Sequence, residues 1–206
     1  MKTTINTYSA SFTASALLFN EFIKAKDSVL AEDFIFQMKE EVLENTRLGI
    51  KTQSARQRIS QEMIKRFESA PSGFWPFFFT RNEEEQKLGL FFLCLKTYVL
   101  MLDFHLEVTL KRWKTRVEHL ESFDLQMRLD EISSANPEVG AWSELTKTKT
   151  ITVYLRTLSE AGLLKKEQLL KPVRINPDFW DFFIKNNESW FLESCFTPIN
   201  QILTKT

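Results

Sequence analysis

The feature that most constrains the fold is a long apolar stretch, LGLFFLCLKTYVLMLDFHLEVTL, at residues 88–110. A helix that crosses a lipid bilayer needs roughly 20 mainly apolar residues. Four polar residues interrupt this stretch, and its cleanest part, 88–102, has only 15 residues. The four are Lys96, Asp103, His105 and Glu107. We therefore expect a buried central helix over about 84–120, either continuous or broken near Asp103, and no membrane span.

The remainder of the chain offers mainly helices to cover such a segment. Only 5 Gly and 6 Pro occur among 206 residues, and strand-like alternation is scarce. Both features favour a mostly helical fold. The 19 Phe and 5 Trp residues supply a large aromatic core. Lys plus Arg equals Asp plus Glu, 27 each, so binding to nucleic acid would have to come from local basic patches.

The N-terminal region, 1–121, is predicted to be a helical domain. An amphipathic pattern indicates a helix over 11–26, with Leu17, Leu18, Phe22 and Ile23 on one stripe. One or two short helices should follow over 27–45, with Asn45 as a stop signal. Two prolines and a glycine predict a turn with aromatic anchors at 70–85.

A basic segment lies at 45–68 and has the pattern of a helix-turn-helix. Thr52 or Ser54 is a candidate cap for a helix from about 55 to 68, with Ile59, Met63 and Phe67 toward the core. Six basic residues occur between 47 and 66, and Glu62 is the single acidic residue among them. We take four of them as candidate DNA contacts: Arg47, Lys51, Arg56 and Arg58. The alternative is an ordinary solvated helix face.

The second region, 122–206, has the element order of a winged helix-turn-helix. The patterns predict helices at 122–137, at 139–146 and at 147–162, then two short strands within 163–175, then an aromatic-rich helical end at 176–196. In a winged helix, the first two helices support the third so that its outer face enters the major groove of DNA. The two strands then place lysine or arginine side chains along the DNA phosphates.

Charge in the second region agrees with such a role. Between 147 and 174 there are seven basic and two acidic residues, in a chain whose total charge is zero. The candidate groove contacts are Lys147, Lys149, Thr152 and Arg156, and the candidate wing contacts are Lys165, Lys166, Lys171 and Arg174. Winged helices also serve as protein-binding modules. The alternatives are therefore a protein-interaction scaffold, using aromatics such as Trp75, Phe77, Trp180 and Trp190, or a structural module alone.

The sequence gives no sign of catalysis, cofactor binding or metal binding. His105 and His119 have no ligand-spaced partners, and no glycine-rich phosphate loop occurs. Cys94 and Cys195 lie far apart and are expected to be free, inert thiols in a reducing cytoplasm. The start of the chain has no apolar segment typical of a secretory signal.

Three stretches together resemble the BrxA family of the BREX bacteriophage-exclusion systems. They are YSASFTASALLFNEF at 8–22, the spaced set Glu44, Asn45, Arg47, Ser54 and Arg58, and Trp142 and Leu145 followed by YLRTLSEAGLL at 154–164. The resemblance covers nearly the whole chain and implies a small, cytosolic, non-catalytic component of phage defence. It implies a mostly helical fold, compared in shape to the NusB antitermination protein, and binding to double-stranded DNA.

That resemblance leaves several questions open. Other BREX components are expected partners, and an RNA-binding role of the NusB kind is a further alternative. Family members have also been described as inner-membrane proteins, which the interrupted 88–110 stretch argues against. Neither a specific DNA sequence nor an oligomeric state follows from the residues.

Overall fold

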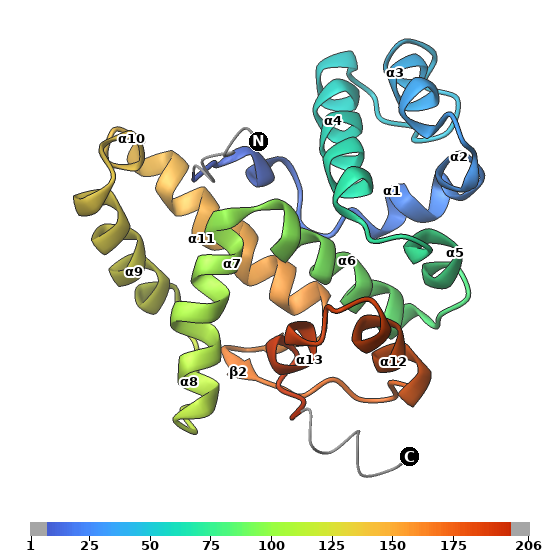
Figure 1. Ribbon diagram of the computed structural model, residues 1–206. Coiled ribbons are helices and arrows are strands. Elements are labelled where there is room, and N and C mark those ends of the chain that lie inside the picture. Colours follow the sequence, from blue (N-terminus) through green and yellow to red (C-terminus); the bar gives the residue numbers. More distant parts are fainter. Residues whose placement is uncertain (1–7, 199–206) are drawn as a thin grey trace, which may run out of the picture.

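The computed structural model describes residues 8–198, which form a mostly helical fold with one short β-hairpin (Figure 1). The first part of the chain contains a 3₁₀ turn, η1, and six helices: η1 Ser11–Ala14, α1 Phe19–Lys24, α2 Lys26–Leu30, α3 Phe34–Glu44, α4 Gln53–Ser69, α5 Phe74–Phe78 and α6 Glu83–Thr97. The middle of the chain contains α7 Val99–Asp103, a π-helical segment η2 Phe104–Thr109, α8 Leu110–Lys114, α9 Ser122–Ala135, α10 Pro137–Gly140 and α11 Glu144–Glu160. The last part contains β1 Leu164–Lys165, β2 Gln168–Leu169, α12 Pro177–Lys185 and α13 Trp190–Ser194.

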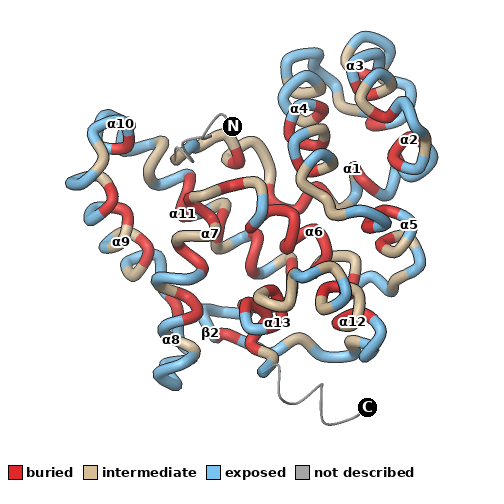
Figure 2. Tube along the Cα trace, in the orientation of Figure 1, coloured by how far each residue is buried: buried red, intermediate tan, exposed pale blue. Residues whose placement is uncertain are grey.

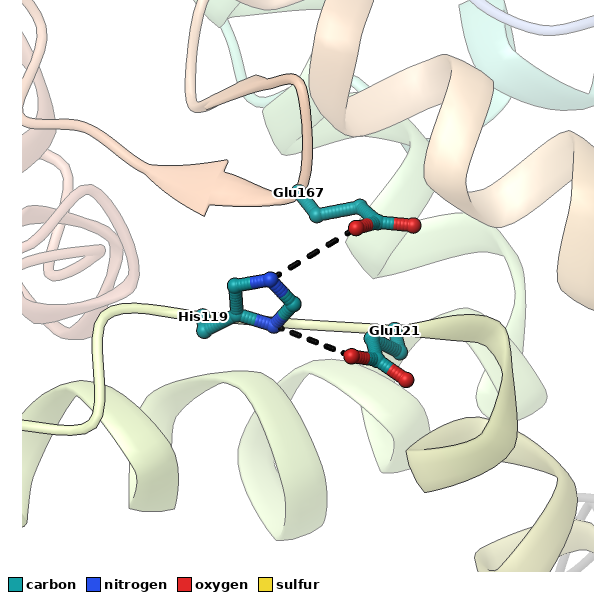
Figure 3. Close-up of side chains that lie close together, drawn as sticks. All are labelled: His119, Glu121 and Glu167. Atoms are coloured by element: carbon teal, nitrogen blue, oxygen red, sulfur yellow. Dashed lines mark ion pairs between the residues drawn. The ribbon is translucent and has the colours of Figure 1, made fainter.

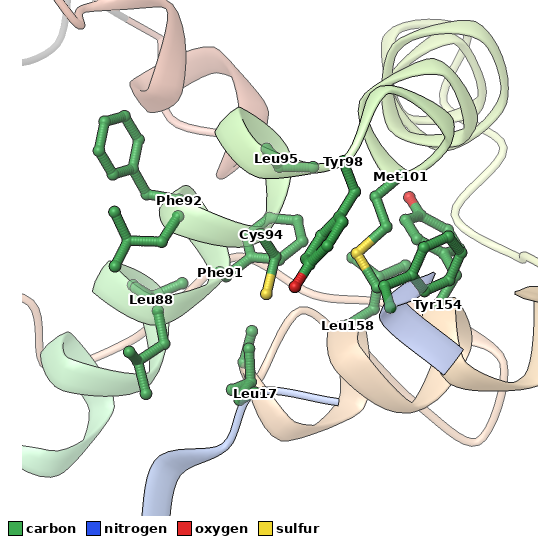
Figure 4. Close-up of a cluster of buried hydrophobic side chains, with 14 of the residues drawn as sticks. Leu17, Leu88, Phe91, Phe92, Cys94, Leu95, Tyr98, Met101, Tyr154 and Leu158 are labelled. Carbon is green, nitrogen blue, oxygen red and sulfur yellow. The ribbon is translucent and has the colours of Figure 1, made fainter. Parts of the chain in front are cut away.

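Helices α6 and α11 lie at the centre, with the α3–α4 pair at one end and the α9–α10 pair at the other (Figure 1). Burial is concentrated where α6 and α11 approach each other, and the outer helices are exposed on their far sides (Figure 2). Leu88, Phe91 and Leu95 of α6 meet Tyr154 and Leu158 of α11 in one buried cluster (Figure 4). The expectation of a buried central helix is confirmed for α6.

The predicted helix over 84–120 is in fact several segments. It breaks at Tyr98, whose backbone is extended, and the axes on either side differ by 109°. Asp103, where a break was the alternative, marks only the change from α7 to the π-helical segment. Among residues 8–198 no single helix is long and apolar enough to cross a membrane, although α6 and the 99–114 segment together reach that length and composition.

A further correction concerns the expected helix at 11–26. Residues 11–14 form a 3₁₀ turn, Leu18 has a left-handed backbone with φ +61°, and a regular helix begins only at Phe19. The carbonyls of Ser15 and Leu17 accept hydrogen bonds from the guanidinium of Arg66, at 3.2 and 2.7 Å, instead of bonding along a helix. Leu17 and Leu18 are nevertheless buried, so the apolar stripe predicted burial correctly but not conformation.

Other local expectations are confirmed. Asn45 ends α3 with a φ of +53°, and the Thr52 hydroxyl caps α4 by accepting from the Ala55 amide. The turn expected at 70–85 also contains the short helix α5, which begins after Gly73 at φ +73°. A single hydrophobic cluster includes residues from both 1–121 and 122–206, and the division of the chain at 121 remains a prediction.

Candidate nucleic-acid interface

Helix α11 is positioned by the short elements that precede it. Asn136 caps α10 with its side-chain oxygen, and Pro137 occupies the first turn. Gly140 brings α10 against α9 so closely that a Cβ there would lie 2.9 Å from the carbonyl oxygen of Ser133. Ser143 then caps α11 by accepting from the Thr146 amide. The bounds predicted for the second helix, 139–146, are therefore wrong. Only the first two of these residues lie in α10, and the others form a turn and the start of α11.

The inner face of α11 is fixed by a buried polar contact as well as by apolar packing. Ile151, Tyr154 and Leu158 are buried, as the periodicity predicted. The Tyr154 hydroxyl lies 3.0 Å from Nδ1 of His105 and 2.7 Å from the hydroxyl of Thr109. Nε2 of His105 lies 2.8 Å from the carbonyl oxygen of Ser194, which can only accept, so Nε2 carries the proton and Nδ1 accepts from Tyr154. Complete burial lowers the pKa of His105 to about 4.

The outer face of α11 carries three of the predicted groove contacts. Lys149, Thr152 and Arg156 are exposed at positions that share one side of the helix. Arg156 pairs with Glu160 at 2.7 Å, and the other oxygen of Glu160 accepts from the Leu17 amide. Lys147 is different: its side chain is 12% exposed and pairs with Glu144, so it does not extend from this face.

The predicted wing is a hairpin of two strands with two residues each, which we call the 164–169 hairpin. Leu164 pairs with Leu169 and Lys165 with Gln168, and Lys166 and Glu167 form the turn with φ values of +47° and +65°. The two leucines are buried and anchor the hairpin, while Lys165 and Lys166 are exposed.

A segment ahead of α9 adds a third strand-like edge to this hairpin. The amide of Leu120 donates to the carbonyl oxygen of Glu167 at 2.8 Å, and the amide of Leu169 donates to that of Glu118 at 2.7 Å. His119 and Gln168 form the intervening β-bridge. The hairpin is thereby tied to residues more than 40 positions earlier in the chain, a pairing that no local pattern predicts.

This pairing brings acidic side chains to the predicted basic wing. His119 lies between two carboxylates, with Nδ1 3.5 Å from Glu121 and Nε2 3.5 Å from Glu167 (Figure 3). Glu118 is also exposed here and accepts from the Gln168 side chain. Counting charge along the sequence missed this, because Glu118 and Glu121 reach the hairpin only through the fold. The three residues in Figure 3, which are His119, Glu121 and Glu167, each carry an atom able to bind a metal ion, and these atoms lie within 4.8 Å of one another.

The last two predicted wing residues lie beyond the hairpin and make contacts of their own. The ammonium of Lys171 lies over the ring of Trp113, 5.9 Å from its centroid. Arg174 lies 3.8 Å from a carboxylate oxygen of Glu84, at the start of α6. Both side chains belong to exposed residues, but neither is part of the hairpin.

The second predicted patch, at 47–66, is only partly a surface. Arg56 donates to the carbonyl oxygens of Val42 and Ile50 at 2.9 and 2.8 Å, so it holds the α3–α4 connection together. Lys51 and Arg58 are exposed and have no ion-pair partner among residues 8–198. Arg47 is 37% exposed and lies 3.8 Å from the buried carboxylate of Glu41.

Arg66, counted among the bases of this segment, is completely buried. It donates to Ser15, Leu17 and the hydroxyl of Tyr98, and Tyr98 in turn donates to Glu62. Proximity to these groups keeps the Arg66 guanidinium charged despite burial and raises its pKa. Arg66 is therefore a structural residue that links α4, the 15–18 segment and the break at Tyr98.

The two predicted patches do not form one surface. The start of α4 lies at the α3–α4 end of the molecule, whereas the 164–169 hairpin lies beside α8, near the opposite end (Figure 1). A DNA contact that used both would have to extend across the whole protein.

The aromatics suggested for a scaffold role are mostly internal. Trp75 and Trp180 are buried, and Phe77 and Trp190 are partly buried against the core. Exposed apolar side chains lie elsewhere, including Phe123 at 64% and Met127 at 51%, one turn apart on α9. Cys94 and Cys195 are free and buried, and burial raises the pKa of both thiols, which keeps them protonated.

Comparison with known proteins gives three consistent likenesses. A family model described as BrxA matches residues 6–187. A protein of Bacillus cereus (strain H3081.97), named BREX protein BrxA, is 24% identical over 162 residues, which are 78% of this chain and 80% of that protein. The crystal structure of an uncharacterized protein from Magnetospirillum magneticum superposes with a TM-score of 0.71 at 20% identity, covering 92% of this chain and 98% of the other. The last likeness shows a shared fold.

Proposed function

This chain belongs to the BrxA family, a component of the BREX phage-defence system, and we propose that it acts there by binding double-stranded DNA through α11. The family resemblance inferred from the residues is thereby confirmed. The observation that carries the proposal is the outer face of α11, where Lys149, Thr152 and Arg156 are exposed on a helix whose opposite face is locked into the core.

The arrangement around α11 supports a groove-binding role. Helices α9 and α10 precede α11 and the 164–169 hairpin follows it, which is the element order of a winged helix, and residues 118–120 are bridged to the hairpin. A recognition helix must approach the bases closely, since the major groove is about 12 Å wide. The short side chains of Thr148 and Thr152 permit this approach, while Lys149 and Arg156 reach for phosphates or base edges.

The 164–169 hairpin is proposed as a weaker contact than its sequence indicates. Lys165 and Lys166 face solvent and suit phosphates, but Glu167 follows them in the turn, and Glu118 and Glu121 contact Gln168 and His119 at the same hairpin. Carboxylates repel the phosphate backbone at short range. Most of the binding free energy is therefore assigned to α11, and Lys51 with Arg58 is a separate, secondary contact.

A salt titration with matched nucleic acids tests the proposal. We would measure fluorescence anisotropy of a labelled 30-base-pair duplex at 50 and 200 mM salt. Neutralising about four phosphates, by Lys149, Arg156, Lys165 and Lys166, gives a log–log slope of roughly −3.6. Absence of saturable binding at 50 mM salt would refute DNA binding. Side chains cannot read the deep major groove of A-form RNA, so a groove-binding helix should prefer the DNA duplex. Tighter binding to an RNA hairpin than to the duplex would therefore favour the RNA-binding alternative.

A second candidate function is docking of another protein on α9. Phe123 and Met127 form an adjacent, largely exposed apolar pair on a charged helix, and such pairs are more typical of contact surfaces than isolated exposed residues. Apolar docking would depend little on salt. Binding of a BREX partner that is lost in Phe123→Ser with Met127→Ser, while DNA binding is retained, would support this candidate.

A further inference from the structure

We infer that His119, Glu121 and Glu167 form a binding site for a divalent transition-metal ion at the tip of the 164–169 hairpin. One donor atom from each residue lies within 4.8 Å of the other two. The inference does not depend on DNA binding, since it concerns the ligand chemistry of the site alone.

The spacing of the three side chains is close to that of a metal site. Imidazole nitrogen and carboxylate oxygen bind zinc at roughly 2.0–2.2 Å. Ligands at that distance around a tetrahedral ion stand roughly 3.4 Å from each other. Each carboxylate is already 3.5 Å from a ring nitrogen of His119. The two carboxylates flank opposite nitrogens, so the half-exposed ring must turn until one nitrogen faces the space between both (Figure 3).

The backbone holds the three residues in place before any ion arrives. His119 and Glu121 are two positions apart in an extended segment, which directs their side chains to the same side. Glu167 lies opposite, fixed by the hydrogen bond from the Leu120 amide to its carbonyl oxygen. Glu121 is held in turn by its backbone amide, which donates to the carboxylate of Asp124 at 2.8 Å. Only side-chain rotations remain for the ion to order.

The donor set selects the class of ion. One imidazole and two carboxylates suit Zn²⁺ and neighbouring transition metals, with water in the remaining position. Mg²⁺ prefers an octahedral shell of oxygens and retains its waters, so it should compete poorly. The chain has two histidines, and the other, His105, is buried. An imidazole-dependent site on the surface therefore has to use His119.

Binding would have two consequences at the hairpin. An ion would link the turn at Glu167 to the 119–121 segment and so restrict the hairpin. It would also offset the negative charge of Glu121 and Glu167, next to Lys165 and Lys166.

Isothermal titration of Zn²⁺ into the full, tag-free chain, without DNA, tests the site. We expect one Zn²⁺ per chain, with affinity reduced at least about tenfold in His119→Ala and in Glu167→Gln, because loss of even an outer-shell partner has that effect. Glu118→Gln is the matched control, since it removes the same charge from a neighbour outside the donor set, and it should bind like the native chain.

Hydrogen exchange supplies a second reading on the same proteins. Amide exchange over 166–169 should slow when Zn²⁺ is added to the native chain and to Glu118→Gln, but not to Glu167→Gln. The inference is overturned if the native chain shows no saturable Zn²⁺ binding, if His119→Ala binds Zn²⁺ as tightly, or if Glu118→Gln loses as much affinity as Glu167→Gln. A DNA titration of the same variants reports separately on the proposed function.

Discussion

The ring of His105 and the hydroxyl of Tyr154 meet 3.0 Å apart in the interior, where the π-helical segment crosses the central helix α11. Because Nε2 of the same ring donates to the carbonyl of Ser194, this pair joins the middle of the chain, α11 and α13. The position of the proposed DNA-binding helix thus depends on a histidine that must stay neutral.

Acid should therefore destabilise the fold through His105. Its pKa is about 4 in the fold, below the ordinary 6.5, so the unfolded chain takes up the proton first as pH falls. The stabilisation is complete above pH 6.5 and is lost between 6.5 and 4. Urea unfolding should show a loss of about 2 kcal/mol from this residue between pH 7.5 and 5.

Two variants isolate the effect of His105 from that of other titrating groups. His105→Gln should lower stability at pH 7.5 but lose less of it on acidification than the native chain. His119→Gln, which removes an imidazole at the surface, is the control for replacing a histidine outside the core. Equal losses in all three proteins would assign the acid sensitivity to carboxylates instead.

Replacing Lys149 and Arg156 by alanine should remove most DNA affinity without unfolding the chain. Both side chains are exposed, so helicity and thermal unfolding should be nearly unchanged. The salt slope should become shallower by about two units. Anisotropy at two salt concentrations measures both quantities, and an unchanged affinity at 50 mM salt would exclude α11 as the DNA-binding helix.

Lys51→Ala with Arg58→Ala is the matched test of the other end of the molecule. Both residues are exposed and belong to α4 and the loop before it, at the α3–α4 end of the molecule, whereas α11 lies at its centre (Figure 1). We expect a smaller loss of affinity than for the α11 pair in the same titration. A larger loss would reverse the order of the two surfaces and make the α3–α4 end the main contact.

Arg66→Ala should be severely destabilising, although Arg66 stands in a segment with the composition of a DNA-binding patch. The variant leaves the carbonyls of Ser15 and Leu17 and the Tyr98–Glu62 pair without their cation. Removing one partner from a buried charged network costs about 3–5 kcal/mol. Arg58→Ala, on the exposed side of the same helix, should cost less than about 0.5 kcal/mol. Urea unfolding compares them, and similar stability of the two variants would contradict the assigned role.

Gly140→Ala should loosen the support beneath α11. The added Cβ would meet the Ser133 carbonyl oxygen at 2.9 Å, and that oxygen belongs to the backbone and cannot rotate away. Overpacking of this kind costs about 1–3 kcal/mol. We expect that loss in urea unfolding, with weaker DNA binding as a result. A stabilised variant would show that α9 and α10 can separate freely.

Local signals in the sequence predicted the local structure well. The caps at Asn45 and Thr52, the Asn-Pro stop after α9 and the buried stripe of α11 were all visible as residue types at fixed spacings. Features set by distant contacts were not visible. Tyr98 stands at a break in a long helix that has no proline or glycine there, and its hydroxyl forms hydrogen bonds with Arg66 and Glu62 in the interior.

The candidate site was harder to predict for the same reason. A count of charge along 147–174 could not include Glu118 and Glu121, which reach the hairpin through β-pairing. Nor could it show that Lys147 is mostly buried and pairs with Glu144. It also could not show that Arg56 and Arg66 donate hydrogen bonds to backbone carbonyl oxygens. The same pairing that brings carboxylates to the predicted basic wing also creates the cluster of His119, Glu121 and Glu167.

The turn between β1 and β2 has a consequence for engineering. Lys166 and Glu167 both adopt left-handed backbone angles, which Asn-Gly would occupy with less strain. A chain rewritten as Asn-Gly at 166–167 should keep a more rigid hairpin while losing both tip side chains at once. Binding that the Asn-Gly variant retains would depend on the shape of the hairpin alone. Binding that it loses would depend on the side chains of Lys166 and Glu167.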